Sequence, residues 1–261
     1  MESMTEPLPN QSAKRAVILG ATGSLGERVT RRLLSAGWTV FGVSTHPAEA
    51  APPSGYEHSQ IDLGLQGAPN SLFDLFKRVA PHLVLHAAVT YGDPRNPPKN
   101  VDELEQMFRV NAFAFYLGFQ QYCTDSSLEQ FCSCIVVNSD SIYHATEQTG
   151  PYASSKAALR VLTSALAVTC RSVNASVSTL LLGPLADVGK RTQLRTLAEK
   201  RGVSEVTLTN EYLRRSNPFL VVTDLIDLDA CYETVRHIVD LGKTANGMLC
   251  KLDGGSSGSL V

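Results

Sequence analysis

Residues 16–26, AVILGATGSLG, decide how the first part of this chain folds. The apolar run at 16–19 predicts a buried strand, and a helical pattern from about Ser24 to Ser35 follows it. Glycines permit a tight turn and a close approach of the backbone to a pyrophosphate, while the start of a helix offers unpaired N–H groups. The spacing is G-x-x-G-x-x-G rather than G-x-G-x-x-G, and between a first strand and a first helix it predicts dinucleotide binding. The residues expected to hold the phosphates are Gly20, Thr22, Gly23, Ser24, Leu25 and Gly26.

Strand and helix patterns alternate along the rest of the chain. Short runs rich in Val, Ile and Leu recur between helical patterns, which is typical of a parallel sheet covered by helices on both faces. We therefore predict an α/β protein with a doubly wound parallel sheet, formed as a single domain by residues 14–261. Further strands are expected near residues 40–43, at a weaker run that ends at 61–62, and near 83–86, 134–137, 177–182 and 248–252. Further helices are expected near residues 72–79, 102–122 and 152–170.

The segment 183–223 interrupts this alternation. It carries two short helical patterns, near Thr192–Lys200 and Ser204–Arg214, and no clear strand. An insertion beyond the carboxyl end of a strand is well placed to cover a ligand site, so we expect a helical substrate lid, with a packing appendage as the alternative. At the other end, the polar residues 1–13 are expected to be a disordered leader.

Composition excludes several classes of function. The 261 residues carry a formal net charge of -2 with a pI of about 6.3, which gives no sign of a nucleic-acid partner. The sequence has no apolar run of roughly 18 residues and no signal peptide, so we expect a cytoplasmic protein with no membrane partner. The six cysteines form no C-x-x-C pair and the six histidines are scattered. Reduced, mostly buried thiols and no metal site are expected.

The end of the second expected strand bears on the choice between NAD and NADP. An acidic residue there would bind the ribose 2′-hydroxyl and repel a 2′-phosphate. The chain instead has Ser44, Thr45 and His46, which favours NADP(H), with NAD(H) as the alternative. After the third expected strand, Asp62 and Leu63 are placed to meet the adenine. A cap of the following turn is the other interpretation of Asp62.

Tyr152 and Lys156 lie four residues apart in the stretch PYASSKAAL at 151–159, which predicts the first turns of a helix. Residues at this spacing share one helix face, so the phenol and the ammonium point the same way. A phenol with a pKa of about 10 is a poor acid or base at neutral pH, and a nearby cation lowers that pKa. The pair predicts a tyrosine that transfers protons; two surface residues that happen to lie four apart are the alternative.

Six segments, in order along the chain, resemble the short-chain dehydrogenase/reductase family. They are the glycine-rich turn at 20–26, His86-Ala87-Ala88, Val110-Asn111-Ala112, Val137-Asn138-Ser139-Asp140-Ser141, the Y-x-x-x-K motif at Tyr152–Lys156, and Leu252-Asp253-Gly254-Gly255. The similarity runs from about residue 15 to residue 255. The glycine spacing, together with Asp140, Ile142 and Tyr143, is more like the family's longer, sugar-nucleotide-modifying branch, although this chain is too short for that branch's larger C-terminal substrate domain.

The resemblance implies a Rossmann fold and a set of catalytic roles. Tyr152 would be the general acid or base, and Lys156 would lower its pKa and bind the nicotinamide ribose. Ser139 would hydrogen-bond the substrate oxygen, with Ser141 as the alternative serine. Asn111 would position a water that links Lys156 to solvent. The resemblance also implies cofactor contacts from Ala87, Ala88, Tyr152, Lys156, Gly183 and Pro184.

We therefore expect an NADP(H)-dependent oxidoreductase of the ketoreductase kind, which reduces a carbonyl or oxidises a secondary alcohol of a small organic metabolite. The mixed local features leave two alternatives: a non-redox epimerase or dehydratase with tightly held NAD, and a non-catalytic dinucleotide-binding protein. Members of the family usually form dimers or tetramers, so a homodimer or homotetramer is expected. Its candidate interface lies on the helices near 102–122 and 152–170, although the aromatic side chains there would equally well close the core: Phe113, Phe115, Tyr116 and Phe119.

Overall fold

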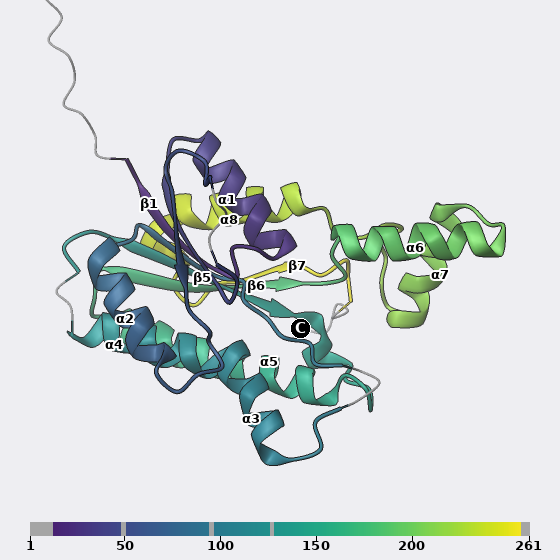
Figure 1. The fold of residues 1–261 in the computed structure, drawn as a ribbon, viewed down its shortest axis with the longest axis horizontal. Helices are drawn as coiled ribbons and strands as arrows, with labels where there is room; N and C mark the ends of the chain where they lie inside the picture. Colours follow the sequence, from purple (N-terminus) through teal and green to yellow (C-terminus); the bar gives the residue numbers. More distant parts are fainter. Residues whose placement is uncertain (1–12, 48–50, 94–96, 126–127, 257–261) are drawn as a thin grey trace, which may run out of the picture.

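The computed structural model describes residues 13–47, 51–93, 97–125 and 128–256. Within them, seven parallel strands form one sheet in the order β3-β2-β1-β4-β5-β6-β7 (Figure 1). The strands are β1 (Arg15–Leu19), β2 (Thr39–Ser44), β3 (Tyr56–Gln60), β4 (Leu83–His86), β5 (Cys132–Ser139), β6 (Ala175–Leu182) and β7 (Leu249–Leu252). The order reverses between β1 and β4, which is the point where folds of this kind bind dinucleotides. The predicted doubly wound sheet is confirmed.

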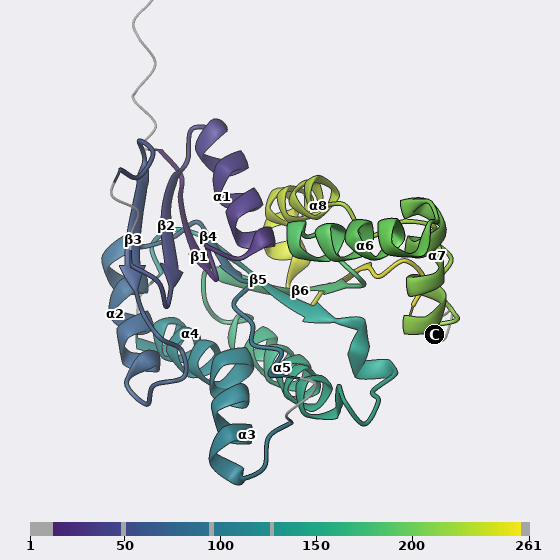
Figure 2. The same cartoon turned by 45° about the vertical axis from the view of Figure 1, so that its right-hand side comes forward.

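Helices cover both faces of the sheet (Figure 1, Figure 2). One face carries α1 (Ser24–Ser35) and α8 (Leu228–Leu241), and the other carries α2 (Ala68–Val79), α4 (Ala114–Asp125) and α5 (Gly150–Thr169). Each layer closes its own hydrophobic cluster against the strands. Because successive side chains of a strand point to opposite faces, Val17 belongs to the cluster with α2 and α4, and Ile18 to the cluster with α1 and α8.

The helix expected over residues 102–122 is interrupted near its middle. α3 (Val101–Phe108) runs into a π-helical turn at Arg109–Phe113, and α4 continues from Ala114. π-helical turns are rare and often lie at functional sites. This one carries Asn111, whose side chain is completely buried.

Two elements were poorly predicted from the sequence. β3 lies at the edge of the sheet and is only half-buried, so its residues alternate poorly between apolar and polar. α8 was absent from the predicted elements, although Asp227 caps it by accepting from the Ala230 backbone N–H at 3.0 Å. Its buried face, with Cys231, Val235 and Ile238, has ordinary helical spacing.

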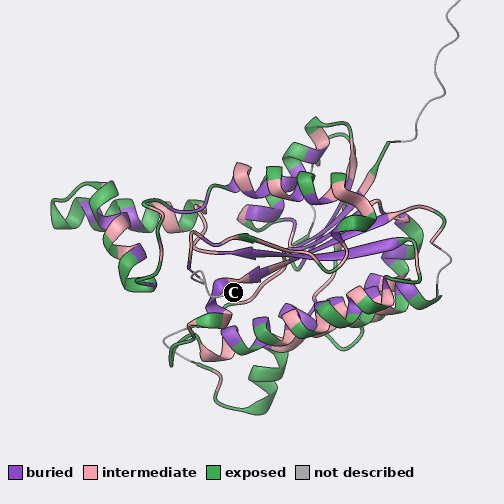
Figure 3. Ribbon diagram, turned by 180° about the vertical axis from the view of Figure 1, so that it is seen from behind, coloured by how far each residue is buried: buried purple, intermediate pink, exposed green. Residues whose placement is uncertain are grey.

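The 183–223 segment forms two helices, α6 (Val188–Arg201) and α7 (Glu205–Ser216), that project from the carboxyl end of the sheet (Figure 1). Exposed residues lie along most of both helices (Figure 3). They pack on each other around a small hydrophobic cluster, with Leu194, Leu208 and Leu213 at its centre. We call this segment the insertion; it starts and ends at the edge of the sheet where the loops after the strands meet.

Packing accounts for several other sequence expectations. Phe115 and Phe119 are fully buried in the core, and Phe113 and Tyr116 pack partly buried against it, so closing the core explains these aromatic residues. The six cysteines are free, and all but the half-buried Cys250 are buried. In the part of the chain that the structure describes, every helix is too short or too polar to cross a lipid bilayer. Residues 1–12 of the expected leader lie outside the described residues.

Candidate functional site

The loop between β1 and α1 is shaped for the close approach of a ligand. Gly20 has a φ angle of +86°, and a Cβ atom there would lie 2.6 Å from the backbone nitrogen of Ala88. A Cβ atom on Gly26 would collide with the Gly20 carbonyl oxygen. Gly23 is the N-cap of α1 and provides no side-chain hydrogen bond to the helix. The loop and helix start fit the pyrophosphate of a dinucleotide, which backbone N–H groups and the positive end of a helix bind well.

The other predicted phosphate-loop residues differ in what they can offer. Thr22 is exposed and Ser24 is partly exposed, whereas Leu25 is buried in the hydrophobic cluster beneath α1, which leaves its backbone to face a ligand. Next to this loop, the Ala87 backbone N–H donates to the Leu19 carbonyl at 2.9 Å. The loops that follow β1 and β4 therefore touch at the reversal of strand order.

The residues after β2 hold one another in place. Ser44 is buried, and its hydroxyl donates to the His46 carbonyl at 3.2 Å. The Nε2 atom of His58, on the neighbouring strand β3, lies 2.9 Å from the same carbonyl oxygen. Thr45 and His46 are exposed. Of the three predicted residues, Ser44 thus supports the loop, and Thr45 and His46 are the ones that face solvent.

Asp62 and Leu63 have local roles in this structure. Asp62 Oδ1 accepts from the backbone N–H of Gly64 at 2.8 Å, which is the turn cap of the second interpretation. The Leu63 side chain is buried in the core cluster with α2. A contact between Leu63 and an adenine would therefore have to come from its backbone.

Tyr152, Lys156 and Ser139 come together at the carboxyl end of β5. The two α5 residues lie in the first turns of the helix, and the Ser139 hydroxyl lies near enough to the Tyr152 phenol to lower its pKa. The Ser141 backbone N–H donates to Ser139 Oγ at 3.2 Å, whereas the Ser141 hydroxyl is buried without a hydrogen-bond partner among the described residues. Of the two candidate serines, Ser139 is the one beside Tyr152.

Burial has the largest effect on the protonation of both Tyr152 and Lys156. Burial raises the pKa of Tyr152, Tyr91 raises it further, and Ser139 lowers it. The Lys156 ammonium donates to the Val137 carbonyl at 3.1 Å, and burial lowers the pKa of Lys156 to about 8. That Lys156 lowers the Tyr152 pKa stays a prediction.

Asn111 clamps the loop after β4 to α5, the helix that carries Tyr152 and Lys156. Its Oδ1 accepts from the Thr90 backbone N–H at 2.8 Å, and its Nδ2 donates to the Thr90 carbonyl and to Ser155 Oγ, both at 2.9 Å. The Ser155 hydroxyl in turn donates to the Tyr152 carbonyl at 2.7 Å. The Asn111 carbonyl lies 3.1 Å from His86 Nε2. Both amide donors of Asn111 are thus bound to protein groups, so its side chain positions the loop after β4 against α5. The expected water-positioning role stays a prediction.

The insertion begins close to the segment after β7. A Cβ atom on Gly183 would lie 2.6 Å from the Asp253 carbonyl oxygen, so this crossing requires glycine. The Pro184 carbonyl accepts from the Ile226 backbone N–H at 2.8 Å. Both predicted residues therefore lie at the carboxyl edge of the sheet, where they fix the direction in which the insertion leaves.

Sequence reasoning missed Tyr91. It follows β4 by five residues, and its ring lies against the Tyr152 ring with centroids 4.9 Å apart and planes at 42°. Partial desolvation raises the pKa of Tyr91, and Asp187 and Tyr212 of the insertion raise it further. The residue nevertheless stays 63% exposed. The one available signal was its place just after a strand end at the edge of the sheet that carries the site.

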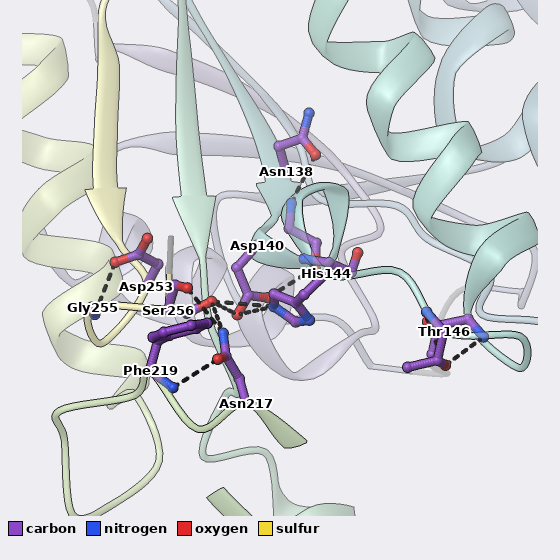
Figure 4. A network of polar contacts seen from close by, with 12 residues as sticks. Asn138, Asp140, His144, Thr146, Asn217, Phe219, Asp253, Gly255 and Ser256 are labelled. Carbon is purple, nitrogen blue, oxygen red and sulfur yellow. Dashed lines mark hydrogen bonds and ion pairs between the residues drawn. The ribbon is translucent and has the colours of Figure 1, made fainter. Parts of the chain in front are cut away.

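A buried polar network beside Ser139 was missed as well. Asp140, His144, Asn217 and Ser256 lie side by side, although they come from three segments far apart in the sequence (Figure 4). Ser and Asn are common in turns and at surfaces, so nothing in the linear sequence marks Asn217 or Ser256 as buried.

Comparison with known proteins adds the family. The sequence model of the NAD dependent epimerase/dehydratase family matches residues 16–232. No curated protein matches the chain.

Several solved structures share the fold. A short chain dehydrogenase family protein from Francisella tularensis subsp. tularensis SCHU S4 has a TM-score of 0.73 and 18% identity, covering 94% of this chain and 99% of that chain. A variant of actinorhodin polyketide ketoreductase with NADPH has a TM-score of 0.73 and 14% identity, covering 96% and 100%. 4-Hydroxyisoleucine dehydrogenase complexed with NADH has a TM-score of 0.73 and 16% identity, covering 94% and 99%. The family match covers most of the chain, and the strand order of the sheet and its glycine loop suit a dinucleotide. The chain belongs to the NAD dependent epimerase/dehydratase family, within the short-chain dehydrogenases/reductases, and is an NAD(P)-dependent enzyme.

Proposed function

We propose that this protein is an NADP(H)-dependent oxidoreductase that reduces a carbonyl group of a small organic molecule, with Tyr152 as the general acid. The observation that carries the proposal is that Ser139, at the carboxyl end of β5, lies close enough to the Tyr152 phenol to lower its pKa. The loops after β1 and β4, which suit a dinucleotide, lie at the same edge of the sheet. The oxidation of a secondary alcohol is the same reaction in reverse.

Each side chain has a defined task in this proposal. When bound, the nicotinamide cofactor supplies the hydride that goes to the carbonyl carbon. Tyr152 gives its phenolic proton to the carbonyl oxygen, and Ser139 hydrogen-bonds the same oxygen as negative charge develops on it. Lys156 lies one helical turn after Tyr152 and binds the ribose hydroxyls of the nicotinamide. Gly20, with the start of α1, holds the pyrophosphate.

The protonation state of Tyr152 suits its role in reduction. Burial raises the pKa of the phenol, so it is protonated at neutral pH, and carbonyl reduction requires a protonated phenol. Oxidation of an alcohol would instead need the phenolate.

The preference for NADP(H) rests on the end of β2. The stretch 42–46, GVSTH, contains no acidic residue that would repel a 2′-phosphate. Thr45 and His46 are exposed there and are available to a phosphate group. Glu49, the first acid beyond this stretch, lies outside the described residues.

We also propose that Tyr91 forms one wall of the substrate site. Its ring covers one side of the Tyr152 ring, and its nearness to Asp187 and Tyr212 connects Tyr152 with the insertion. Aromatic rings at such a spacing favour a substrate with an apolar or planar face beside its carbonyl. The insertion would then act as the substrate lid.

Association into a homodimer or homotetramer is part of the proposal. α4 and α5 carry exposed apolar side chains on their outer faces, namely Leu117, Val161 and Val168. Light scattering on the purified protein measures the mass directly, and a monomer at micromolar concentration would contradict this part.

Separate titrations with NADPH and NADH, followed by nicotinamide fluorescence, test the cofactor. We expect both to bind and NADPH to bind more tightly. Replacing Tyr152 with Phe should lower carbonyl reduction by roughly 10²- to 10⁴-fold, the usual contribution of a general acid, with NADPH affinity retained. Unchanged turnover would refute the role of Tyr152. Purified protein that carries stoichiometric nicotinamide and does not turn over added NADPH would instead indicate the epimerase or dehydratase class.

A further inference from the structure

Three buried polar side chains meet next to Ser139, and each belongs to a different part of the chain. Asp140 directly follows β5 and is 7% exposed; Asn217 ends α7 and is 2% exposed; Ser256 follows β7 and is 3% exposed. Burying polar groups to this extent is unfavourable unless they bond to one another. Figure 4 shows the three side chains in contact with one another.

The hydrogen bonds run in one direction through the Ser256 hydroxyl. Asn217 Nδ2 donates to Ser256 Oγ at 3.0 Å and to the Ser256 carbonyl at 2.9 Å. The Ser256 hydroxyl then donates to Asp140 Oδ2. His144 Nε2 lies 3.2 Å from both Asp140 Oδ2 and Ser256 Oγ. An amide at one end and a carboxylate at the other thus fix the orientation of the serine between them.

The network reaches the proposed active site through the second oxygen of the same carboxylate. Asp140 Oδ1 accepts from the Ser139 hydroxyl at 3.3 Å. The Ser139 oxygen lies beside the Tyr152 phenol. A serine hydroxyl has one proton, which Asp140 accepts in the free enzyme and which has to turn to the substrate oxygen during reduction. The carboxylate therefore holds in place the side chain that is proposed to contact the substrate oxygen.

At its other end the network holds the base of the insertion. α6 and α7 pack mainly on each other, and Asn217 is where α7 stops and the chain returns to the sheet. Asn217 Oδ1 also accepts from the Phe219 backbone N–H at 2.9 Å, which shapes this return. Near it, the Val221 backbone N–H donates to the Gly254 carbonyl at 2.9 Å, so the return runs beside the segment that presents Ser256.

We propose that Asp140, Ser256 and Asn217 are positioning residues that join the base of the insertion to the orientation of Ser139. This inference rests on the proposed function, because it gives the insertion the role of substrate lid and Ser139 the role of substrate contact. It assigns the network a purpose beyond stability: an insertion held at Asn217 keeps the serine loop in the geometry that the reduction needs.

Two substitutions, one of an amide by a carboxylate and one of a carboxylate by an amide, test the network while keeping a polar side chain at each position. In Asn217→Asp, a second carboxylate faces the Ser256 hydroxyl and Asp140; in Asp140→Asn, the hydroxyl loses its charged acceptor. In the double variant the amide lies at position 140 and the carboxylate at position 217, so the hydrogen bonds through the Ser256 hydroxyl run in the opposite direction. The amide oxygen at position 140 can still accept from the Ser139 hydroxyl. Asn210→Ala is the matched control, since Asn210 lies on the same helix and donates to the Val206 carbonyl within it.

Two readouts separate this inference from the proposed function. Trypsin cleavage at the Lys and Arg residues of 188–216 reports on attachment of the insertion and needs no activity. We expect each single exchange to speed this cleavage by roughly 5- to 100-fold, the range for a buried polar group left unpaired, and the double variant to return most of the way. In steady-state reduction the single exchanges should raise KM for the ketone, with NADPH affinity unchanged.

The outcomes are distinct. Cleavage and KM that stay at wild-type values in both single variants would overturn the inference, and so would a double variant that is as damaged as the sum of the two. If a single variant fails to fold, Ser256→Ala removes the central hydroxyl with no new charge and is expected to give the same pattern more weakly. A wild-type protein that binds neither NADPH nor NADH would contradict the proposed function. The cleavage data would still report on the network.

Discussion

Asn111 Nδ2 lies 2.9 Å from Ser155 Oγ, and this hydroxyl donates onward to the Tyr152 carbonyl. The π-helical turn that carries Asn111 thereby reaches the backbone carbonyl of Tyr152 through the Ser155 hydroxyl. The same amide bonds both backbone groups of Thr90, the residue before Tyr91. One buried side chain therefore sets the positions of both tyrosines.

Replacing Asn111 with Ala should lower the free energy of unfolding by about 1–3 kcal/mol, because it leaves buried groups of Thr90 and Ser155 unpaired. The reduction rate should fall more than NADPH affinity, since the phosphate loop is untouched. Denaturant melts and steady-state kinetics measure the two effects. The control is Asn174→Ala at an exposed site, which should stay within about 0.5 kcal/mol of wild type. An Asn111→Ala protein with wild-type stability would contradict the clamp.

Tyr91 should affect the substrate rather than the cofactor. In Tyr91→Ala the wall beside Tyr152 is lost, and KM for a ring-bearing ketone should rise roughly 2- to 12-fold, because an aromatic contact contributes about 0.5–1.5 kcal/mol. Tyr91→Phe keeps the ring and should remain near the wild-type KM if stacking is the main contribution. Asn174→Ala, at an exposed site before the amino end of β6, serves again as the control. Equal KM values in wild type and Tyr91→Ala would remove Tyr91 from the site.

The reductive kcat/KM should fall as pH rises through about 8. Burial lowers the pKa of Lys156 to about 8, so its ammonium is present below that pH and is lost above it. This parameter reports ionisations of the free enzyme and can be followed between about pH 6 and pH 10. Lys156→Arg keeps a positive charge throughout this range, so the decline near pH 8 should disappear even if overall activity is lower. If kcat/KM still falls near pH 8 in Lys156→Arg, the ionisation of a group other than Lys156 causes the decline.

Gly26 should not tolerate alanine. The added Cβ would collide with the Gly20 carbonyl oxygen, so the loop between β1 and α1 must shift. We expect NADPH affinity to fall at least tenfold, equivalent to about 1.4 kcal/mol, as measured by fluorescence titration. Gly67→Ala is the matched control, because a Cβ atom there meets nothing within 4 Å. A Gly26→Ala protein with normal affinity would show that the backbone of this loop does not hold the cofactor.

Stability should depend on pH through His86. Burial is the main cause that lowers the pKa of His86 to about 3, from 6.5 in an unfolded chain, and Lys156 lowers it further. The unfolded state therefore gains a proton below pH 6.5 that the folded state does not bind, and folded stability declines as pH falls from 6.5 towards 3. The contribution is at most about 1.4 kcal/mol per pH unit. Urea melts of His86→Leu should show a shallower decline over this window; an unchanged slope would contradict a buried neutral His86.

The sequence by itself determined the features that depend on neighbouring residues. Apolar strand runs at 16–19, 83–86 and 177–182 predicted buried parallel strands, because the period and composition of a strand are local. The glycines at 20–26 and the four-residue interval from Tyr152 to Lys156 are likewise local, so the phosphate loop and the shared helix face could be predicted. The edge strand β3 and the helix α8 show the limit of this approach. The weak apolar pattern of β3 left its bounds imprecise, and α8 was not predicted although its buried face has helical spacing.

Only the tertiary structure decided which groups act on one another. The sequence favoured Ser139 and left Ser141 as the alternative, and the fold brings Ser139 to Tyr152 and buries the Ser141 hydroxyl without a hydrogen-bond partner among the described residues. It also turns the Lys156 ammonium to Val137. Asp140 and Asn217 are joined across 77 positions by Ser256. Protonation and hydrogen bonding depend on burial and on contacts between distant segments, and neither is encoded in the spacing of residues along the chain.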